Sequence, residues 1–133
     1  MTVATSGQKT VLVIEDDPWT RTITTALLAG EGFAVVEAKN GEEGLKMARQ
    51  HTPDAVLLDL ALPTKSGLDV LHELKGDGTT DSIPVIIVSA YGSLMNEHDA
   101  HQAVGVIQKP FDYDDLVGQV SRATADALAV ALT

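Results

Sequence analysis

Five short apolar runs alternate with helix-like segments along this chain of 133 residues. Short apolar runs bounded by turn residues are typical of strands that are buried on both faces of a parallel sheet. The runs cover residues 11–14, 33–38, 55–58, 84–88 and 104–108. Strict alternation of strands and helices favours right-handed crossovers. The pattern therefore predicts an α/β domain, in which a parallel five-stranded sheet carries helices on both faces.

The helix-like segments begin and end at recognisable residues. Asp17 can cap a helix whose first turn contains Pro18, and Gly30 ends that helix. The other helices are expected at about 41–50, 66–74, 94–102 and from about 112 into the alanine-rich end. A chain of this length suits one domain. We therefore expect a loose leader at 1–9, a single domain at 10–128, and the tail of the last helix at 129–133.

Composition and charge exclude several classes of function. The chain has 9 lysine and arginine residues against 19 aspartate and glutamate residues, a formal net charge of −10. A nucleic-acid backbone would repel such a surface, so we expect no direct nucleic-acid binding. The absence of cysteine excludes thiol catalysis and thiolate metal sites. No apolar stretch approaches a membrane span, and residues 1–9 lack a signal-peptide pattern, which predicts a cytoplasmic protein without membrane contact.

Polar and charged side chains follow four of the predicted strands at the points where the strands end. In chain order they are Glu15 with Asp16, then Asp59, Ser89 and Lys109. Because ligands of open α/β sheets bind beyond the carboxyl ends of the strands, these groups should converge. Three crowded carboxylates favour a hard cation such as Mg²⁺, and a lysine offers a fixed charge to a phosphate. Together the groups predict phosphoryl transfer onto an aspartate.

The motifs at these strand ends resemble those of response-regulator receiver domains of two-component signalling. They are Val-Ile-Glu-Asp-Asp-Pro at 13–18, Leu-Leu-Asp-Leu-Ala-Leu-Pro at 57–63 with Gly67, Val-Ser-Ala at 88–90, and Lys-Pro-Phe at 109–111. Each motif is weak alone, but their order and their places at strand ends make the set specific. The resemblance covers about residues 10–128. It implies a flavodoxin-like (βα)5 fold with strand order 2-1-3-4-5.

The resemblance also implies a role for each acidic residue. Asp59 would be the phosphoacceptor. Asp16 and Asp59 would bind Mg²⁺ directly, together with the backbone carbonyl of Ala61. Glu15 would act mainly through metal-bound water. These residues would make the site Mg²⁺-dependent.

Two further site residues and the partners follow from the same resemblance. Lys109 would pair with the phosphoryl group, and Ser89 would move to hydrogen-bond one of its oxygens. The peptide bond between Lys109 and Pro110 is expected to be cis. The donor would be a sensor histidine kinase or a histidine phosphotransfer protein, and the target a downstream protein or a missing output domain. We expect a monomer or weak dimer that works as a signalling switch, not as an enzyme.

Other functions that the same fold could support are weaker interpretations. A phosphatase with an aspartate nucleophile needs a second acid two residues later, where Ala61 stands. A flavodoxin-like cofactor carrier would need neither Lys109 nor the acidic pair. A receiver-like interaction module that works without phosphorylation is the main alternative. A phosphodonor assay with an Asp59→Asn control would decide between this module and the phospho-accepting switch.

The chain departs from the common receiver pattern in its signalling residues. Receivers usually have a Tyr, Phe or His three residues before the lysine, where this chain has Val106. Valine has no ring to relocate, so we hypothesise that Tyr91 takes over part of this role. Trp19 is interpreted as either a half-exposed packing residue or a partner contact, and the partner contact is favoured. The histidines are interpreted as surface or structural residues; they are His51, His72, His98 and His101.

Overall fold

The computed structural model describes residues 7–90 and 96–125, which form one parallel sheet flanked by helices. The strands are β1 (Thr10–Ile14), β2 (Ala34–Ala38), β3 (Ala55–Asp59), β4 (Val85–Ser89) and β5 (Gly105–Gln108). The helices are α1 (Pro18–Gly30), α2 (Gly41–His51), α3 (Gly67–Gly76), α4 (Glu97–Gln102) and α5 (Tyr113–Thr124). All strand pairs are parallel, and the order is β2-β1-β3-β4-β5. The predicted α/β fold with strand order 2-1-3-4-5 is confirmed.

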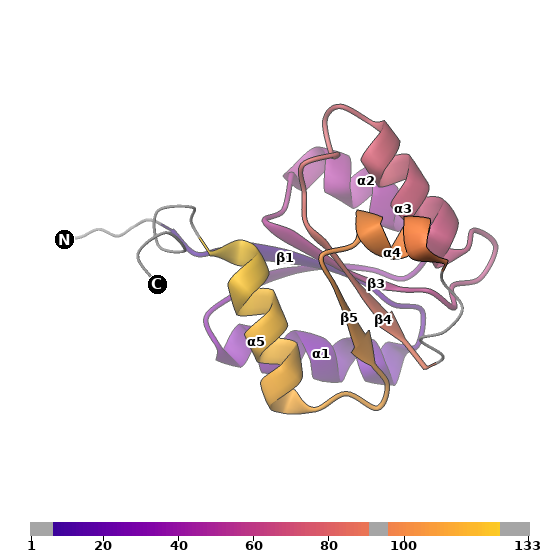
Figure 1. The fold of residues 1–133 in the computed structure, drawn as a ribbon. Helices are drawn as coiled ribbons and strands as arrows, with labels where there is room; N and C mark the ends of the chain where they lie inside the picture. Colours follow the sequence, from indigo (N-terminus) through magenta and orange to yellow (C-terminus); the bar gives the residue numbers. More distant parts are fainter. Residues whose placement is uncertain (1–6, 91–95, 126–133) are drawn as a thin grey trace.

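The helices cover both faces of the sheet. Figure 1 shows α1 and α5 on one face, and α2, α3 and α4 on the other. Successive side chains of a strand point to opposite faces, so each central strand must be apolar at every position. In β1, Leu12 and Ile14 pack towards α2 and α3, whereas Val11 and Val13 pack towards α1 and α5. This two-sided burial explains the uninterrupted apolar runs of the sequence.

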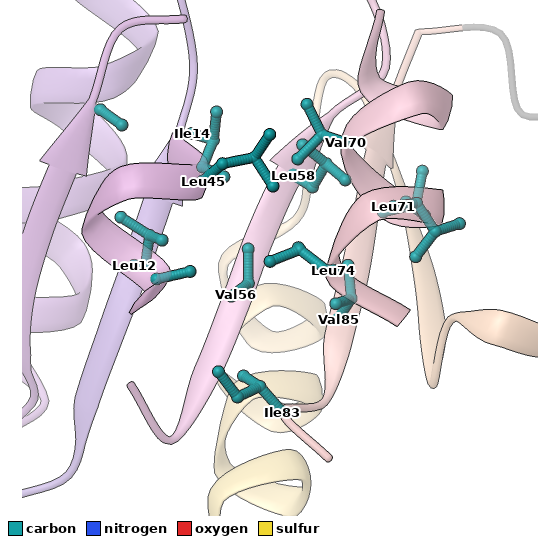
Figure 2. Close-up of a cluster of buried hydrophobic side chains, with 13 residues drawn as sticks. Leu12, Ile14, Leu45, Val56, Leu58, Val70, Leu71, Leu74, Ile83 and Val85 are labelled. Carbon is teal, nitrogen blue, oxygen red and sulfur yellow. The ribbon is translucent and has the colours of Figure 1, made fainter. Parts of the chain in front are cut away.

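The core beneath α2 and α3 is a cluster of interlocking aliphatic side chains. Figure 2 shows Leu45 of α2 and Leu74 of α3 lying against Val56 and Leu58 of β3. Leu58 and Val56 are fully buried, and Leu74 retains only 1% of its exposed surface. Each fully buried side chain of this size contributes roughly 1.5–3 kcal/mol to folding. The sheet is therefore a rigid platform for the loops at its carboxyl edge.

Each helix starts at a side chain that accepts a backbone hydrogen bond from the residue three positions later. The capping residues are Asp17, Asn40, Ser66, Asn96 and Asp112. Such caps satisfy amide groups that the first helical turn leaves unpaired. We expected the fourth helix to start near residue 94. In the described residues α4 instead begins at Glu97, because Asn96 caps it, while residues 91–95 lie outside the described part.

Two further boundaries differ from the sequence-based expectation. Strands β3 and β4 each run one residue further than expected, so that Asp59 and Ser89 are themselves the last strand residues. Helix α5 ends at Thr124, because Ala125 has extended backbone angles. The Thr124 hydroxyl donates to the carbonyl of Val120, and such back-bonding weakens helix continuation. The predicted helical tail at 129–133 lies outside the described residues.

Helix α4 is attached to its neighbour by a polar contact. Its one buried residue is Asp99, whose Oδ1 lies 2.7 Å from Nε2 of His72 on α3. His72 is half-exposed and structural, as expected of the histidines, and His98 and His101 are exposed.

Within the described residues, no helix has the length and apolar character needed to cross a membrane.

Candidate functional site: an acidic cluster with a lysine

The structure brings three strand-end side chains together at the carboxyl edge of the sheet. Glu15 follows β1, Asp59 ends β3, and Lys109 follows β5. The Lys109 Nζ lies 2.7 Å from Glu15 Oε1 and 3.2 Å from Asp59 Oδ2. Lys109 is 94 positions from Glu15 and 50 positions from Asp59 in the chain. Their convergence follows from the strand order, which places β3 between β1 and β4.

Asp16 completes a group of three carboxylates. One carboxylate oxygen from each of Glu15, Asp16 and Asp59 lies within 4.8 Å of the others. Glu15 and Asp59 are buried, whereas Asp16 is exposed at the rim. Three carboxylates at this spacing repel one another when all are ionised, so a cation among them is favourable, and oxygen donors of this kind suit Mg²⁺. The donor set therefore fits a divalent metal ion.

Asp59 is held by its own loop. It is 5% exposed, and its Oδ1 accepts a hydrogen bond from the backbone N–H of Ala61 at 3.1 Å. The following loop approaches closely: the N–H of Gly67 donates to the carbonyl of Leu60 at 3.1 Å. These bonds fix the Asp59 carboxylate at the end of β3, with one oxygen towards Lys109.

Lys109 and Ser89 belong to neighbouring strand ends. The Lys109 N–H donates to the carbonyl of Ser89 at 2.9 Å, and Ser89 is 3% exposed. Burial alone would lower the Lys109 pKa, but Glu15 and Asp59 raise it above its ordinary value. Lys109 is therefore a cation at neutral pH. The peptide bond between Lys109 and Pro110 is cis, as expected.

The Glu15 carboxyl group has a raised pKa. Burial, with a further contribution from the neighbouring Asp59, raises the pKa of Glu15 from 4.5 to about 7. The hydrogen bond from Lys109 opposes this shift without cancelling it. Without a metal ion, Glu15 is therefore partly protonated near neutral pH. Its second oxygen accepts a hydrogen bond from the N–H of Asp17 at 3.2 Å.

This raised pKa predicts that the metal-free protein loses stability as pH rises. Between pH 4.5 and about 7 the folded state holds a Glu15 proton that the unfolded state has released. Folding therefore becomes less favourable across that window, by on the order of 2–3 kcal/mol in total. Urea unfolding with a chelator, compared with Glu15→Gln, measures this effect. We expect Glu15→Gln to gain stability relative to the wild type as pH rises; a constant difference would contradict the shift.

Some predicted site features are not tested by the described residues. The Ala61 carbonyl as a metal ligand stays a prediction. Tyr91 lies outside the described residues, so its proposed signalling role also stays a prediction. Val106 on β5 is 39% exposed, and Trp19 is 72% exposed. Sequence reasoning missed Arg21, whose Nη1 donates to the carbonyl oxygens of Glu15 and Asp16; its position five residues after Asp16 carried no recognised signal.

Comparisons with known proteins agree with this geometry. The family model described as the response regulator receiver domain matches residues 11–121. The polar-differentiation response regulator DivK of Brucella anthropi is 32% identical over 121 residues, covering 90% of this chain and 98% of that protein. The response regulator TrrA of Thermotoga maritima, solved in complex with Mg²⁺ and BeF, is 30% identical with a TM-score of 0.80, covering 87% of this chain and 99% of that one.

A further solved structure supports the fold alone. The chemotaxis response regulator CheY4 of Vibrio cholerae has a TM-score of 0.80 at 22% identity, covering 88% of this chain and 99% of that one. A five-stranded α/β fold with an acidic cluster and a lysine at its carboxyl edge defines a signalling receiver. The chain belongs to the response regulator receiver domain family of two-component systems.

Proposed function

We propose that this receiver accepts a phosphoryl group on Asp59 in a Mg²⁺-dependent reaction, and that the modification switches partner binding. The observation that carries the proposal is the environment of the Asp59 carboxylate. It is buried at a strand end, with Lys109 Nζ 3.2 Å away and the carboxylates of Glu15 and Asp16 beside it. A carboxylate nucleophile next to a fixed cation and a divalent-metal site is suited to phosphoryl transfer.

Asp59 and Lys109 have different roles in the proposed reaction. An oxygen of Asp59 attacks the phosphorus of a phosphohistidine on the donor protein. A P–O bond to Asp59 forms, the P–N bond breaks, and the imidazole leaves with its electron pair. Bound Mg²⁺ would supply positive charge to the phosphoryl oxygens. Lys109 neutralises charge that develops on the transferred group, which is an electrostatic contribution to catalysis.

The acidic residues would hold the metal ion, and Ser89 would respond to the phosphoryl group. Asp16, Asp59 and the Ala61 carbonyl would bind Mg²⁺ directly, with Glu15 acting through water. The Ser89 hydroxyl would hydrogen-bond the phosphoryl group and shift a pre-existing equilibrium of the segment that follows β4. TrrA, which is 30% identical, was solved with Mg²⁺ and BeF, and this similarity supports the cofactor assignment.

The proposed donor is a sensor histidine kinase or a histidine phosphotransfer protein. The target is a downstream protein or an output domain, and the proposed setting is the cytoplasm. An apolar surface lies beside the site: Ile23 of α1 and Phe111 line a hollow that Lys109 also borders. Trp19 is exposed on the same helix, two residues after its cap. A protein donor that reaches Asp59 would cover this surface.

Trp19→Ala is therefore expected to slow transfer from a protein donor while leaving transfer from acetyl phosphate unchanged. Exposed tryptophans at interfaces commonly contribute 2 kcal/mol or more, which corresponds to roughly a thirtyfold loss of affinity. Transfer from a phosphorylated donor, measured with donor concentration varied, gives the affinity. Equal transfer rates for the wild type and Trp19→Ala at all donor concentrations would show that Trp19 does not contact the donor.

Incubation with acetyl phosphate and Mg²⁺, followed by intact-mass measurement, tests the proposed function. We expect one added phosphoryl group on the wild type, and none on Asp59→Asn or in the presence of a chelator. An unmodified wild type under conditions that preserve its fold would favour the phosphorylation-independent interaction module.

A further inference from the structure

Arg21 connects helix α1 to the backbone of the acidic segment. Its Nη1 donates to the carbonyl oxygen of Glu15 at 2.9 Å and to that of Asp16 at 3.3 Å. The Arg21 side chain keeps only 19% of its accessible surface. Hydrogen bonds from a charged donor are strong, and they strengthen further when water is excluded. One side chain thus holds the backbone of two of the three acidic residues.

The Arg21 guanidinium is contacted by Glu37 on the neighbouring strand β2. Its Nε lies 3.9 Å from Glu37 Oε1 on β2, and Glu37 Oε2 accepts a hydrogen bond from the Thr25 hydroxyl. In the sheet register Glu37 lies opposite Val13, two residues before the acidic pair begins. The carboxylate of Glu37 therefore sits beside the end of β1. Thr25 thus orients Glu37, whose carboxylate lies within ion-pair distance of the Arg21 guanidinium.

Asp16 depends on this support more than the other two acids do. Glu15 and Asp59 are buried and each contacts Lys109, and Asp59 also accepts the Ala61 N–H. Asp16 is exposed, and within residues 7–90 and 96–125 no hydrogen bond or ion pair holds its carboxylate. The point and direction from which the Asp16 side chain leaves the main chain are therefore set by its backbone, which Arg21 holds.

We propose that Arg21 is a positioning residue for the metal site: it orients the Asp16 carboxylate by fixing the carbonyls of the acidic segment. This inference rests on the proposed function, because it takes Mg²⁺ as the ligand of the three carboxylates. Arg21 Nη1 contacts the carbonyl oxygens of Glu15 and Asp16, not their carboxylates. Its positioning effect therefore passes through the backbone, and is separate from the effect of its charge.

The charge of Arg21 and its support of the backbone should have opposite effects on Mg²⁺ affinity when Arg21 is replaced. A cation near a metal site repels Mg²⁺, so loss of the arginine charge alone should strengthen metal binding. Loss of the backbone support should weaken it, because Asp16 must then be ordered when the metal ion binds. The sign of the change in Mg²⁺ affinity therefore separates the two effects.

The test compares Arg21→Met with Arg49→Met. Arg49 lies on α2 and pairs with Asp77 at 3.1 Å, so its replacement removes the same charge away from the acidic segment. Mg²⁺ is titrated at constant ionic strength, with fluorescence of Trp19, the chain's one tryptophan, as the signal. Thermal unfolding without metal records stability separately. We expect affinity to weaken about tenfold in Arg21→Met, the size of a lost charged hydrogen bond, and to stay within about twofold in Arg49→Met.

Phosphorylation by acetyl phosphate adds a second readout. At saturating Mg²⁺ the rate in Arg21→Met should return close to the wild-type rate, because positioning affects only the ordering of the metal site. Unchanged or tighter Mg²⁺ binding in Arg21→Met would overturn the inference, as would a rate that stays low at saturating Mg²⁺. If Arg21→Met does not fold, Arg21→Lys decides: it keeps the charge but loses the guanidinium fork. We expect weaker Mg²⁺ binding there, and wild-type affinity would contradict the proposal.

The wild-type titration separates this inference from the proposed function. If the wild type shows no Mg²⁺ binding by fluorescence or calorimetry, the proposed function itself fails. If the wild type binds Mg²⁺ and Arg21→Met binds it equally well, only the positioning role fails.

Discussion

Replacing Lys109 with methionine is expected to slow phosphoryl acceptance from acetyl phosphate by about a hundredfold. Methionine keeps most of the side-chain length but removes the ammonium group, which lies 2.7 Å from Glu15 and 3.2 Å from Asp59. The charge that develops on the transferred phosphoryl group then loses its fixed cationic partner. The rate of mass increase under saturating Mg²⁺ measures the effect.

Lys46→Met is the matched control for Lys109→Met. Lys46 is exposed on α2, so the substitution removes the same charge from the surface. We expect this control to accept the phosphoryl group at the wild-type rate. Similar slow rates in both variants would mean that net charge, and not the position of Lys109, governs the reaction. A wild-type rate in Lys109→Met would show that Lys109 does not contribute to phosphoryl transfer.

Gly67→Ala is expected to destabilise the fold by roughly 1–3 kcal/mol and to weaken Mg²⁺ binding. A Cβ at residue 67 would lie 2.4 Å from the carbonyl oxygen of Asp59 and 2.5 Å from Cα of Leu60. Both atoms belong to the backbone and cannot rotate away, so the loop after β3 must shift. Because the loop begins at Asp59, the shift displaces the Asp59 carboxylate and disturbs the carboxylate cluster as well as the fold.

The other end of the same helix provides the control for Gly67→Ala. A Cβ at Gly76 would meet no atom within 4 Å, and Gly76 is the last residue of α3. Alanine stabilises a helix by roughly 0.5–1 kcal/mol relative to glycine, so Gly76→Ala should be neutral or stabilising. Urea unfolding of both variants measures the difference. Equal stability of the two variants would show that the loop tolerates the added methyl group.

The sequence was sufficient to predict where the chemistry converges, because that depends only on topology. Asp59 and Lys109 are 50 residues apart, yet each stands at the carboxyl end of a strand that apolar runs identify. Once the strand order is known, the ends of parallel strands must meet at one edge of the sheet. The apolar runs therefore predicted the sheet, and the family resemblance supplied the strand order. Together they predicted that Glu15, Asp59 and Lys109 lie close together.

Contacts that depend on side-chain direction could not be predicted in this way. The hydrogen bonds of Arg21 run backwards from a helix to carbonyls five and six residues earlier, and no spacing rule identifies them. The contact between His72 and Asp99 depends on how α3 and α4 lie against each other. Helix α4 begins at Glu97, and not near residue 94 as expected, because the Asn96 side chain caps it.

Locating the phosphoryl group on the chain determines whether Asp59 is the phosphoacceptor. The wild type is treated with acetyl phosphate and Mg²⁺, and any acyl phosphate is then reduced with borohydride, which converts a phosphorylated aspartate to homoserine. Peptide mass spectrometry identifies the reduced residue. We expect homoserine at position 59 and at no other aspartate. Modification of Asp16 or another acid, with Asp59 unchanged in the folded wild type, would contradict it.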